Sequence, residues 1–146
     1  MSRSNVIEID GKEYELYFST WTLLRISDRC GGDIEKLGDW LGKGKTSEML
    51  SKYNAVITDL ANGAVIKHNT DIAFGFEQGE KKELFPDDYF INVMQVSDIM
   101  KYREEIFRTL NMGTDYEIPE GVEVQEKDPE LAELEREKNQ TGRGEA

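Results

Sequence analysis

The sequence predicts a mainly helical α+β domain that opens with a β-hairpin. Two short segments with alternating apolar residues, 5–9 and 12–18, flank Asp10-Gly11, a dipeptide typical of a two-residue hairpin turn. About four to five amphipathic segments with helical spacing follow, up to residue 112. Residues 113–146 are acidic and poor in apolar side chains. We therefore expect a folded domain over 1–112 and a largely disordered acidic tail over 113–146.

The turn sets the register of the hairpin. Counting outward from Asp10-Gly11 pairs Ile9 with Lys12 and Ile7 with Tyr14. One face of the hairpin is then apolar and the other is mostly acidic. Because a lone hairpin is marginal in water, the apolar face is expected to pack on helices. That face consists of Ile7, Ile9, Tyr14, Leu16 and Phe18.

The first predicted helix follows the hairpin at once. Ser19 or Thr20 can act as its N-cap, and Gly31-Gly32 supplies the left-handed exit. Apolar residues recur at helical spacing, so one face of this helix is expected to be buried. The stripe contains Leu23, Ile26 and Cys30, and Trp21 and Leu24 widen it.

A short helix and a glycine-lysine loop come next. Asp33 can cap a helix that carries Ile34, Leu37 and Leu41 on one side. The loop over residues 42–46, GKGKT, contains part of a P-loop pattern. The full motif requires a glycine at position 39, which is Asp39, and a preceding buried strand. The sequence therefore indicates an interhelical loop and no nucleotide site.

The third predicted helix is the longest. Its apolar stripe runs from Met49 to Ala64 at intervals of three and four residues. Gly63 interrupts it, and a glycine inside a helix costs about 1 kcal/mol relative to alanine. Because the stripe continues beyond this glycine, we expect the helix to reach about Lys67.

Residues 69–85 lose the helical period. Ile72, Phe74 and Phe76 alternate, which leaves a short strand, a second hairpin and an ordered loop as open alternatives. His68, the single histidine, is expected near the end of the preceding helix, where it can serve the last carbonyls.

Two further helices are expected before residue 113. Pro86 and the two aspartates after it are typical of a helix start. Ser97-Asp98 indicates a fresh N-cap, and Gly113 ends the last helix. The stripe of that last helix consists of Ile99, Tyr102, Ile106 and Leu110.

The chain lacks the residue patterns of catalytic and metal sites. It has one histidine and one cysteine, so a zinc site of the usual composition is not expected. Cys30 lies on an apolar stripe, and a serine or cysteine nucleophile needs an organised base. A lone cysteine also fits a reducing cytosol. We expect a protein that is not an enzyme and has no cofactor.

The charge disfavours two classes of partner. The formal net charge is −12, and residues 112–146 contribute 11 acidic and 4 basic side chains to it. Nucleic-acid binding requires a basic surface, so no such partner is expected. No apolar run approaches the length of a membrane span. An acidic inhibitor that mimics nucleic acid ranks last among the function hypotheses, because most of the charge lies in the tail.

The late helices carry a surplus of large apolar side chains. These can form plain core, or they can form a surface that binds an irregular apolar partner, as methionine-rich surfaces do. A short segment of the tail, 129–138, has helical spacing but is too short to be stable alone. The candidate partner-binding residues are Tyr89, Phe90, Met94, Met100, Tyr102, Phe107, Met112, Leu131 and Leu134.

The segment 7–26, IEIDGKEYELYFSTWTLLRI, resembles the start of the tail assembly chaperones of long-tailed (siphophage-like) bacteriophages and related prophages. The type and order of the elements agree up to residue 112. This resemblance implies a non-catalytic protein that binds the tape measure protein and helps to recruit tail tube subunits. It also implies action in the host cytoplasm and absence from the mature virion.

The same resemblance implies a second, longer product made by ribosomal frameshifting. Glu137-Lys138-Asn139 is compatible with a slippery codon sequence for this event. The alternative function is a structural minor tail or head–tail connector subunit. Homo-oligomers are also an open alternative, because both edges of a two-stranded hairpin can accept another strand.

Overall fold

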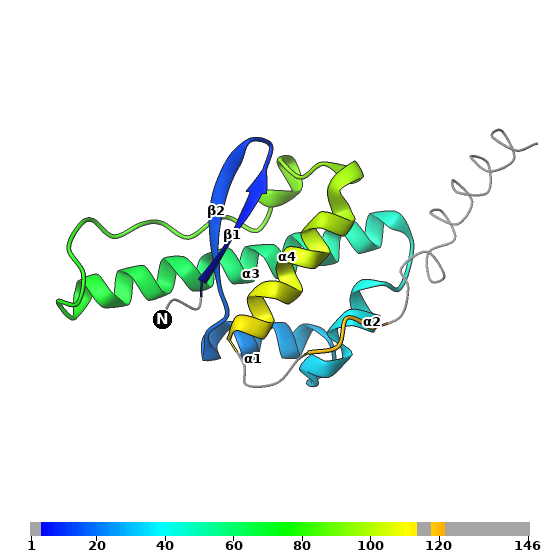
Figure 1. The fold of residues 1–146 in the computed structure, drawn as a ribbon, viewed down its shortest axis with the longest axis horizontal. Helices are drawn as coiled ribbons and strands as arrows, with labels where there is room; N and C mark the ends of the chain where they lie inside the picture. Colours follow the sequence, from blue (N-terminus) through cyan, green and yellow to red (C-terminus); the bar gives the residue numbers. More distant parts are fainter. Residues whose placement is uncertain (1–3, 114–117, 122–146) are drawn as a thin grey trace, which may run out of the picture.

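The computed structural model describes residues 4–113 and 118–121, and it confirms the predicted mainly helical α+β class. Strands β1 and β2 form an antiparallel hairpin that lies across helices α3 and α4 (Figure 1). Helix α3 runs the length of the molecule, and its C-terminal end projects from the rest (Figure 1). The elements are β1 (Ser4–Ile9), β2 (Lys12–Tyr17), α1 (Thr20–Arg29), η1 (Ile34–Lys36), α2 (Leu37–Leu41), α3 (Thr46–Ala73), η2 (Phe90–Asn92), η3 (Val96–Asp98) and α4 (Ile99–Met112), where η marks a 3-10 turn.

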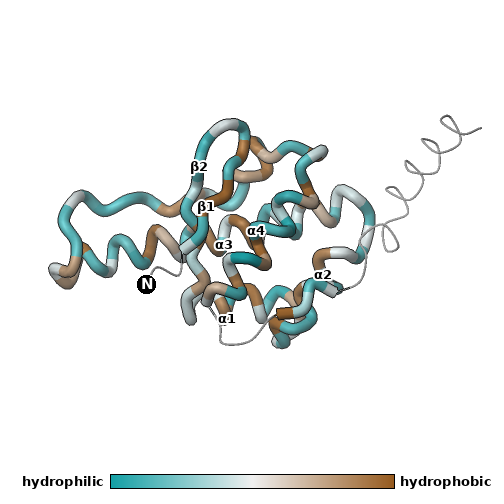
Figure 2. The backbone as a smooth tube through the Cα atoms, in the orientation of Figure 1, coloured by the Kyte–Doolittle hydropathy of each residue, from teal (hydrophilic) through white to brown (hydrophobic). Residues whose placement is uncertain are grey.

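The hairpin has the predicted register. Ile9 pairs with Lys12, and Ile7 pairs with Tyr14. Asp10 and Gly11 have φ values of 53° and 77°, the left-handed conformation that a two-residue turn of this kind requires. All five residues of the predicted apolar face are buried. Hydrophobic segments gather where the hairpin meets α3 and α4 (Figure 2).

Helix α1 begins and ends as predicted, but fewer of its apolar residues are buried than expected. The Ser19 hydroxyl accepts a hydrogen bond from the Thr22 amide, so Ser19 is the N-cap. Ile26 and Cys30 are buried, whereas Leu24 is exposed. The prediction that Leu24 widens the buried stripe is wrong, because two residues of helix place it about 200° around the axis from Ile26.

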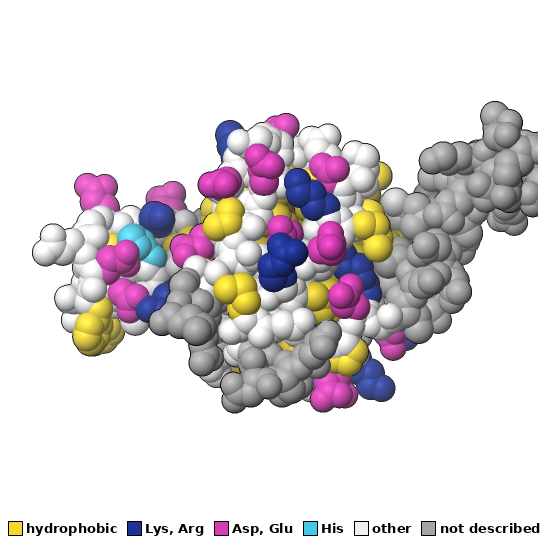
Figure 3. Space-filling model, viewed as in Figure 1, with side chains coloured by type: hydrophobic (Ala, Val, Ile, Leu, Met, Phe, Trp, Pro, Cys, Tyr) yellow, Lys and Arg dark blue, Asp and Glu magenta, His cyan; other side chains and the backbone are white. Residues whose placement is uncertain are grey.

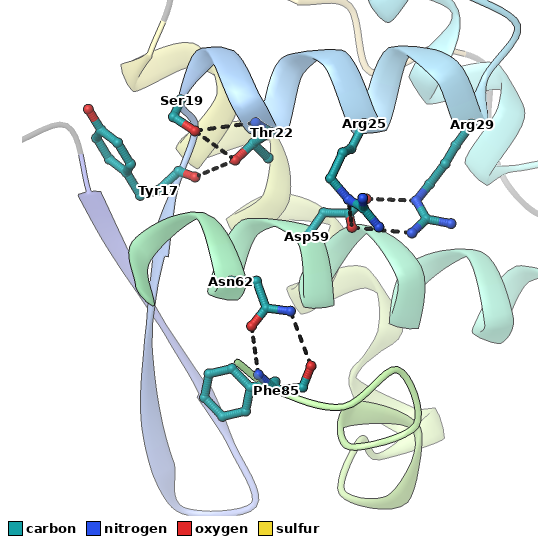
Figure 4. Close-up of polar contacts among 8 residues, drawn as sticks. All are labelled: Tyr17, Ser19, Thr22, Arg25, Arg29, Asp59, Asn62 and Phe85. Carbon is teal, nitrogen blue, oxygen red and sulfur yellow. Dashed lines mark hydrogen bonds and ion pairs between the residues drawn. The ribbon is translucent and has the colours of Figure 1, made fainter. Parts of the chain in front are cut away.

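A buried carboxylate joins α1 to α3. Asp59 of α3 accepts hydrogen bonds from Arg25 Nε at 3.2 Å and from Arg29 Nε at 2.6 Å (Figure 4). The hydrogen bond with Asp59 raises the pKa of Arg29 above its ordinary value. Both arginines keep contact with water while the Asp59 carboxylate is almost fully buried. The two ion pairs that share Asp59 therefore fix the angle at which α1 lies on α3.

Helix α3 is longer than predicted, reaching Ala73 instead of Lys67. It passes the end of β2 at Gly63 with almost no intervening space. A Cβ atom at Gly63 would lie 2.6 Å from the Tyr17 carbonyl oxygen and closer still to the Thr22 hydroxyl. Thr22 donates its hydroxyl to that same carbonyl (Figure 4). The glycine is thus required by the crossing and does not interrupt the helix.

Two expectations for residues 69–98 need correction. The strand and second-hairpin alternatives near Phe74 are wrong, because the chain leaves α3 in an ordered loop. The helix expected from Pro86 is also wrong: its place is taken by a turn and η2. Phe85, Tyr89 and Phe90 converge on Tyr14 with ring centroids 5.1–5.9 Å from it. Packing of these three rings on Tyr14 holds the segment as a turn and a single 3-10 helix.

The folded part continues past the expected boundary at residue 112. Ile118 is buried in the core, and its amide donates to Asn111 Oδ1 at 2.8 Å. Arg103 of α4 is buried and donates to the Glu120 carbonyl oxygen, so it fastens this segment to α4. The predicted disorder of residues 122–146 lies outside the described residues.

Candidate functional site

The structure disperses the predicted partner-binding residues. Phe90, Tyr102 and Phe107 are fully buried in the core, so they cannot contribute to a surface. Tyr89 and Met94 are half-buried and pack against that core. Met100 and Met112 are exposed, but twelve residues of α4 separate them by roughly 18 Å. Leu131 and Leu134 lie outside the described residues.

Within residues 4–113 and 118–121, no group of three histidine, cysteine or acidic side chains could hold a metal ion. Burial raises the pKa of the Cys30 thiol, which donates to the carbonyl oxygens of Ile26 and Asp33. Over the same ranges, none of the helices has the length and apolar character needed to cross a bilayer.

The aromatic cluster has a measurable electrostatic consequence. Burial, and then the hydrogen bond between the Tyr14 and Tyr89 hydroxyls at 2.8 Å, raise the pKa of Tyr14 to about 12. Tyrosine in the unfolded chain ionises near pH ~10. The stability that comes from keeping Tyr14 neutral is therefore fully present below pH ~10 and is lost as the pH rises through ~12.

We expect the free energy of unfolding to fall between pH ~10 and ~12, by up to about 1.4 kcal/mol per pH unit for this one group. Urea unfolding at a series of alkaline pH values measures the slope. The variant Tyr14→Phe should give a shallower slope, because it has no hydroxyl to ionise. An unchanged slope in that variant would contradict the assignment.

The projecting end of α3 carries an exposed apolar patch. Phe74, Phe76 and Leu84, named here the tip patch, are exposed by 74%, 84% and 53%. Figure 3 shows a small group of hydrophobic side chains at this end of the molecule, beside charged side chains. The Phe76 amide donates to the Asp71 carbonyl oxygen at 2.8 Å, and Gly75 has a φ of 81°, so the turn is fixed. The aromatic rings are thus held outward by an ordered turn.

A hollow of about 310 Å³ lies beside the tip patch. Phe74 and Leu84 line it from two different segments, and Ile66 of α3 also lines it. Lys81 brings a positive charge to its rim. The lining residues are Ile66, Asn69, Thr70, Ala73, Phe74, Lys81 and Leu84.

The chain returns from the tip along α3 as an extended segment, residues 77–85, named here the strap. Asn62 donates to the Phe85 carbonyl oxygen at 3.1 Å and accepts from the Phe85 amide at 2.7 Å (Figure 4). Asn69 makes the same pair of bonds with Lys82, both at 2.8 Å. His68 contacts Glu77 and the Glu80 carbonyl oxygen. The expectation that His68 serves the last carbonyls of its helix is therefore wrong.

The sequence contained a signal for the strap but not for the patch. Asn62 and Asn69 are seven residues apart, a spacing that places two side chains on one helix face. Polar side chains repeated in this way indicate a polar neighbour along the helix. Phe74 and Phe76 lie outside any helical stripe, and their alternation with Ile72 belongs to a strand that does not form, so their exposure could not be inferred from spacing.

Comparisons of the chain with protein-family models, with curated proteins and with solved structures find no match. The site therefore has to be interpreted from its own geometry. The tip patch offers apolar contact area, and the asparagine pairs offer main-chain hydrogen bonds. Both are means of binding another polypeptide.

Proposed function

We propose that this protein is a non-catalytic assembly chaperone that binds apolar helical segments of a larger protein. The proposal combines the resemblance of residues 7–26 to phage tail assembly chaperones with one structural observation, the tip patch. Phe74, Phe76 and Leu84 are exposed apolar side chains on an ordered, projecting arm. Such a surface suits the shielding of hydrophobic segments in a partner.

The magnitudes support a transient contact. Full burial of a Phe or Leu side chain contributes about 1.5–3 kcal/mol. Three such side chains therefore contribute roughly 5–9 kcal/mol before the cost of association, which is at least about 4 kcal/mol. Contact through the tip patch alone is weak, as expected of a chaperone that has to release its client.

The full proposal follows the resemblance. The client is the tape measure protein, and the chaperone helps to recruit tail tube subunits around it. It acts in the host bacterial cytoplasm and leaves before the virion is mature. A frameshift-extended form of the same chain takes part in the assembly.

Co-expression with a fragment of the tape measure protein from the same genome tests this proposal. The unaltered chain should raise the soluble fraction of the fragment. The double variant Phe74→Ser/Phe76→Ser should lose most of that gain, because two lost burials of about 2 kcal/mol each weaken binding more than ~100-fold. Leu24→Ser is the matched control, since Leu24 is equally exposed but lies on α1.

Thermal unfolding should be nearly unchanged in both variants, because the substituted side chains are exposed. No gain in solubility with the unaltered chain would refute the chaperone function. An equal gain with the double variant would refute only the tip patch as the contact surface. Finding the protein in purified particles by mass spectrometry would instead favour a minor tail or head–tail connector subunit.

A further inference from the structure

One face of α3 carries a row of polar side chains, two of which bind the strap. Asn54, Thr58, Asn62 and Asn69, named here the amide ladder, lie on one side of the helix because their spacings are four, four and seven residues. Asn62 and Asn69 each bind one residue of the strap in both directions. Asn54 donates to the Asp87 carbonyl oxygen at 2.8 Å. The ladder therefore binds an extended main chain through hydrogen bonds to its N–H and C=O groups.

The amide ladder is only partly satisfied by the strap. Asn54 Oδ1 and Thr58 Oγ1 are enclosed but have no hydrogen-bond partner among the described residues. Thr58 as a whole is 4% exposed. A buried hydroxyl without a partner carries a desolvation penalty of about 1–3 kcal/mol. The strap therefore leaves two acceptors of the row without a donor.

The strap is attached to the rest of the molecule mainly through side chains. Residues 77–84 are exposed, and the half-buried ring of Phe85 is the apolar anchor. In the described part of the chain, residues 78–85 make no backbone–backbone hydrogen bond. Six side-chain hydrogen bonds from Asn62, His68 and Asn69 attach the strap, and bonds of this kind contribute about 0.5–1.5 kcal/mol each. Local opening of the strap therefore costs roughly 3–9 kcal/mol before the burial of Phe85 is counted.

A hollow of about 160 Å³ lies beneath the strap, between β2 and α3. Glu13 and Glu15 of β2 border it on one side, and Ala61 and Val65 of α3 border it on the other. Because Lys12 is hydrogen-bonded to Ile9 across the turn, Glu13 and Glu15 direct their main-chain groups away from β1. Removal of the strap would join this hollow to the amide ladder and open a groove with main-chain partners on both walls.

We propose that this groove binds an extended segment of a partner chain through its main chain, in place of the strap. The strap shows the pattern that fits: one residue bound by Asn69, and an aromatic residue three positions later in the place of Phe85. The groove should otherwise accept many sequences, because the asparagine carboxamides bind main-chain N–H and C=O groups, and every residue except proline carries both. This inference goes beyond the proposed chaperone role, because it concerns a different surface and does not depend on the identity of the client.

The test uses the full chain and a fluorescent peptide that copies residues 79–88, GEKKELFPDD. Lys82→Pro in the protein removes the N–H group that Asn69 accepts, so it weakens the strap and leaves the ladder intact. Loss of about 1 kcal/mol of strap attachment should tighten peptide binding about fivefold relative to the unaltered chain. Fluorescence anisotropy measures both affinities. Phe85→Ser, which removes the apolar anchor of the strap, opens the groove independently.

Changes in the peptide show which of its groups the protein binds, because these changes leave the strap of the protein unaltered. N-methylation at the residue that copies Lys82 removes the N–H for Asn69 and should weaken binding about fivefold. N-methylation at the residue that copies Lys81 is the control, because the Lys81 amide has no hydrogen bond in the described structure. Replacing the phenylalanine of the peptide with alanine should weaken binding more than tenfold.

Three results would overturn the inference. The first is no saturable binding to either opened variant, and the second is equal affinity for the two N-methylated peptides. The third is a concentration-dependent dimer of Lys82→Pro without peptide, seen by light scattering. In that case the strap of a second copy, and not a partner segment, would fill the groove.

Discussion

Replacing Gly63 with alanine is expected to destabilise the folded domain by about 2 kcal/mol or more. Helix propensity alone predicts the opposite, since alanine is better than glycine by about 1 kcal/mol inside a helix. The added Cβ would lie 2.6 Å from the Tyr17 carbonyl oxygen, a main-chain atom that cannot rotate away. Either α3 or the end of β2 has to move.

The clash would also disturb a hydrogen bond. The Thr22 hydroxyl, the nearest atom to the added Cβ, donates to the Tyr17 carbonyl oxygen at 3.2 Å. If Thr22 moves, the Tyr17 carbonyl oxygen loses its hydrogen-bond donor. This oxygen lies where the chain passes from β2 to α1. The cost therefore combines overpacking with a weakened junction between hairpin and helix.

Urea unfolding followed by circular dichroism measures this effect. Ser51→Ala is the matched control, because Ser51 is an exposed residue of the same helix. It should leave stability unchanged or raise it by up to about 0.5 kcal/mol. A Gly63→Ala variant as stable as the unaltered chain would show that α3 and β2 can separate without cost.

Replacing Arg103 with methionine is the second change with a large expected effect, a loss of about 2–4 kcal/mol. The guanidinium is 4% exposed. It donates to the Tyr53 hydroxyl at 3.2 Å, to the Gly38 carbonyl oxygen at 3.4 Å and to the Glu120 carbonyl oxygen. Methionine fills a similar volume but leaves these buried acceptors without a donor.

The substitution should destabilise the segment 118–121 locally, in addition to lowering the stability of the whole domain. Arg103 joins α2, α3 and the segment 118–121, so its removal should speed hydrogen exchange in that segment beyond the change in global stability. Arg108→Met is the matched control, because Arg108 is an exposed arginine on the same helix and pairs with Glu105. Its cost should not exceed about 1 kcal/mol. Equal effects of the two substitutions would refute the fastening role of Arg103.

Local chemistry was sufficient to predict the ends of several elements. The Asp10-Gly11 turn determined the hairpin register, and Ser19 marked the start of α1. Burial on α4 also followed from its period, since Tyr102, Ile106 and Leu110 are all in the core. In each case the prediction depends on residues that are close in sequence. Their local geometry does not require contacts with distant parts of the chain.

Features that depend on distant partners were missed. Gly63 looked like an interruption because the Tyr17 carbonyl oxygen that crosses it belongs to β2. The helix start at Pro86 was overridden when Tyr89 and Phe90 both packed on Tyr14. Spacing places apolar residues on a face but cannot say whether that face is covered, so Phe107 was considered for a surface and proved to be core.

The length of α3 makes it a spacer as well as a scaffold. Its 28 residues span about 42 Å at 1.5 Å per residue. Phe74 and Phe76 of the tip patch lie at the C-terminal end of α3, whereas Gly121 lies against Gly38 and Asp39 of α2, near the N-terminal end of α3 (Figure 1). A partner that covered the tip patch would therefore leave the α2 end of the molecule uncovered.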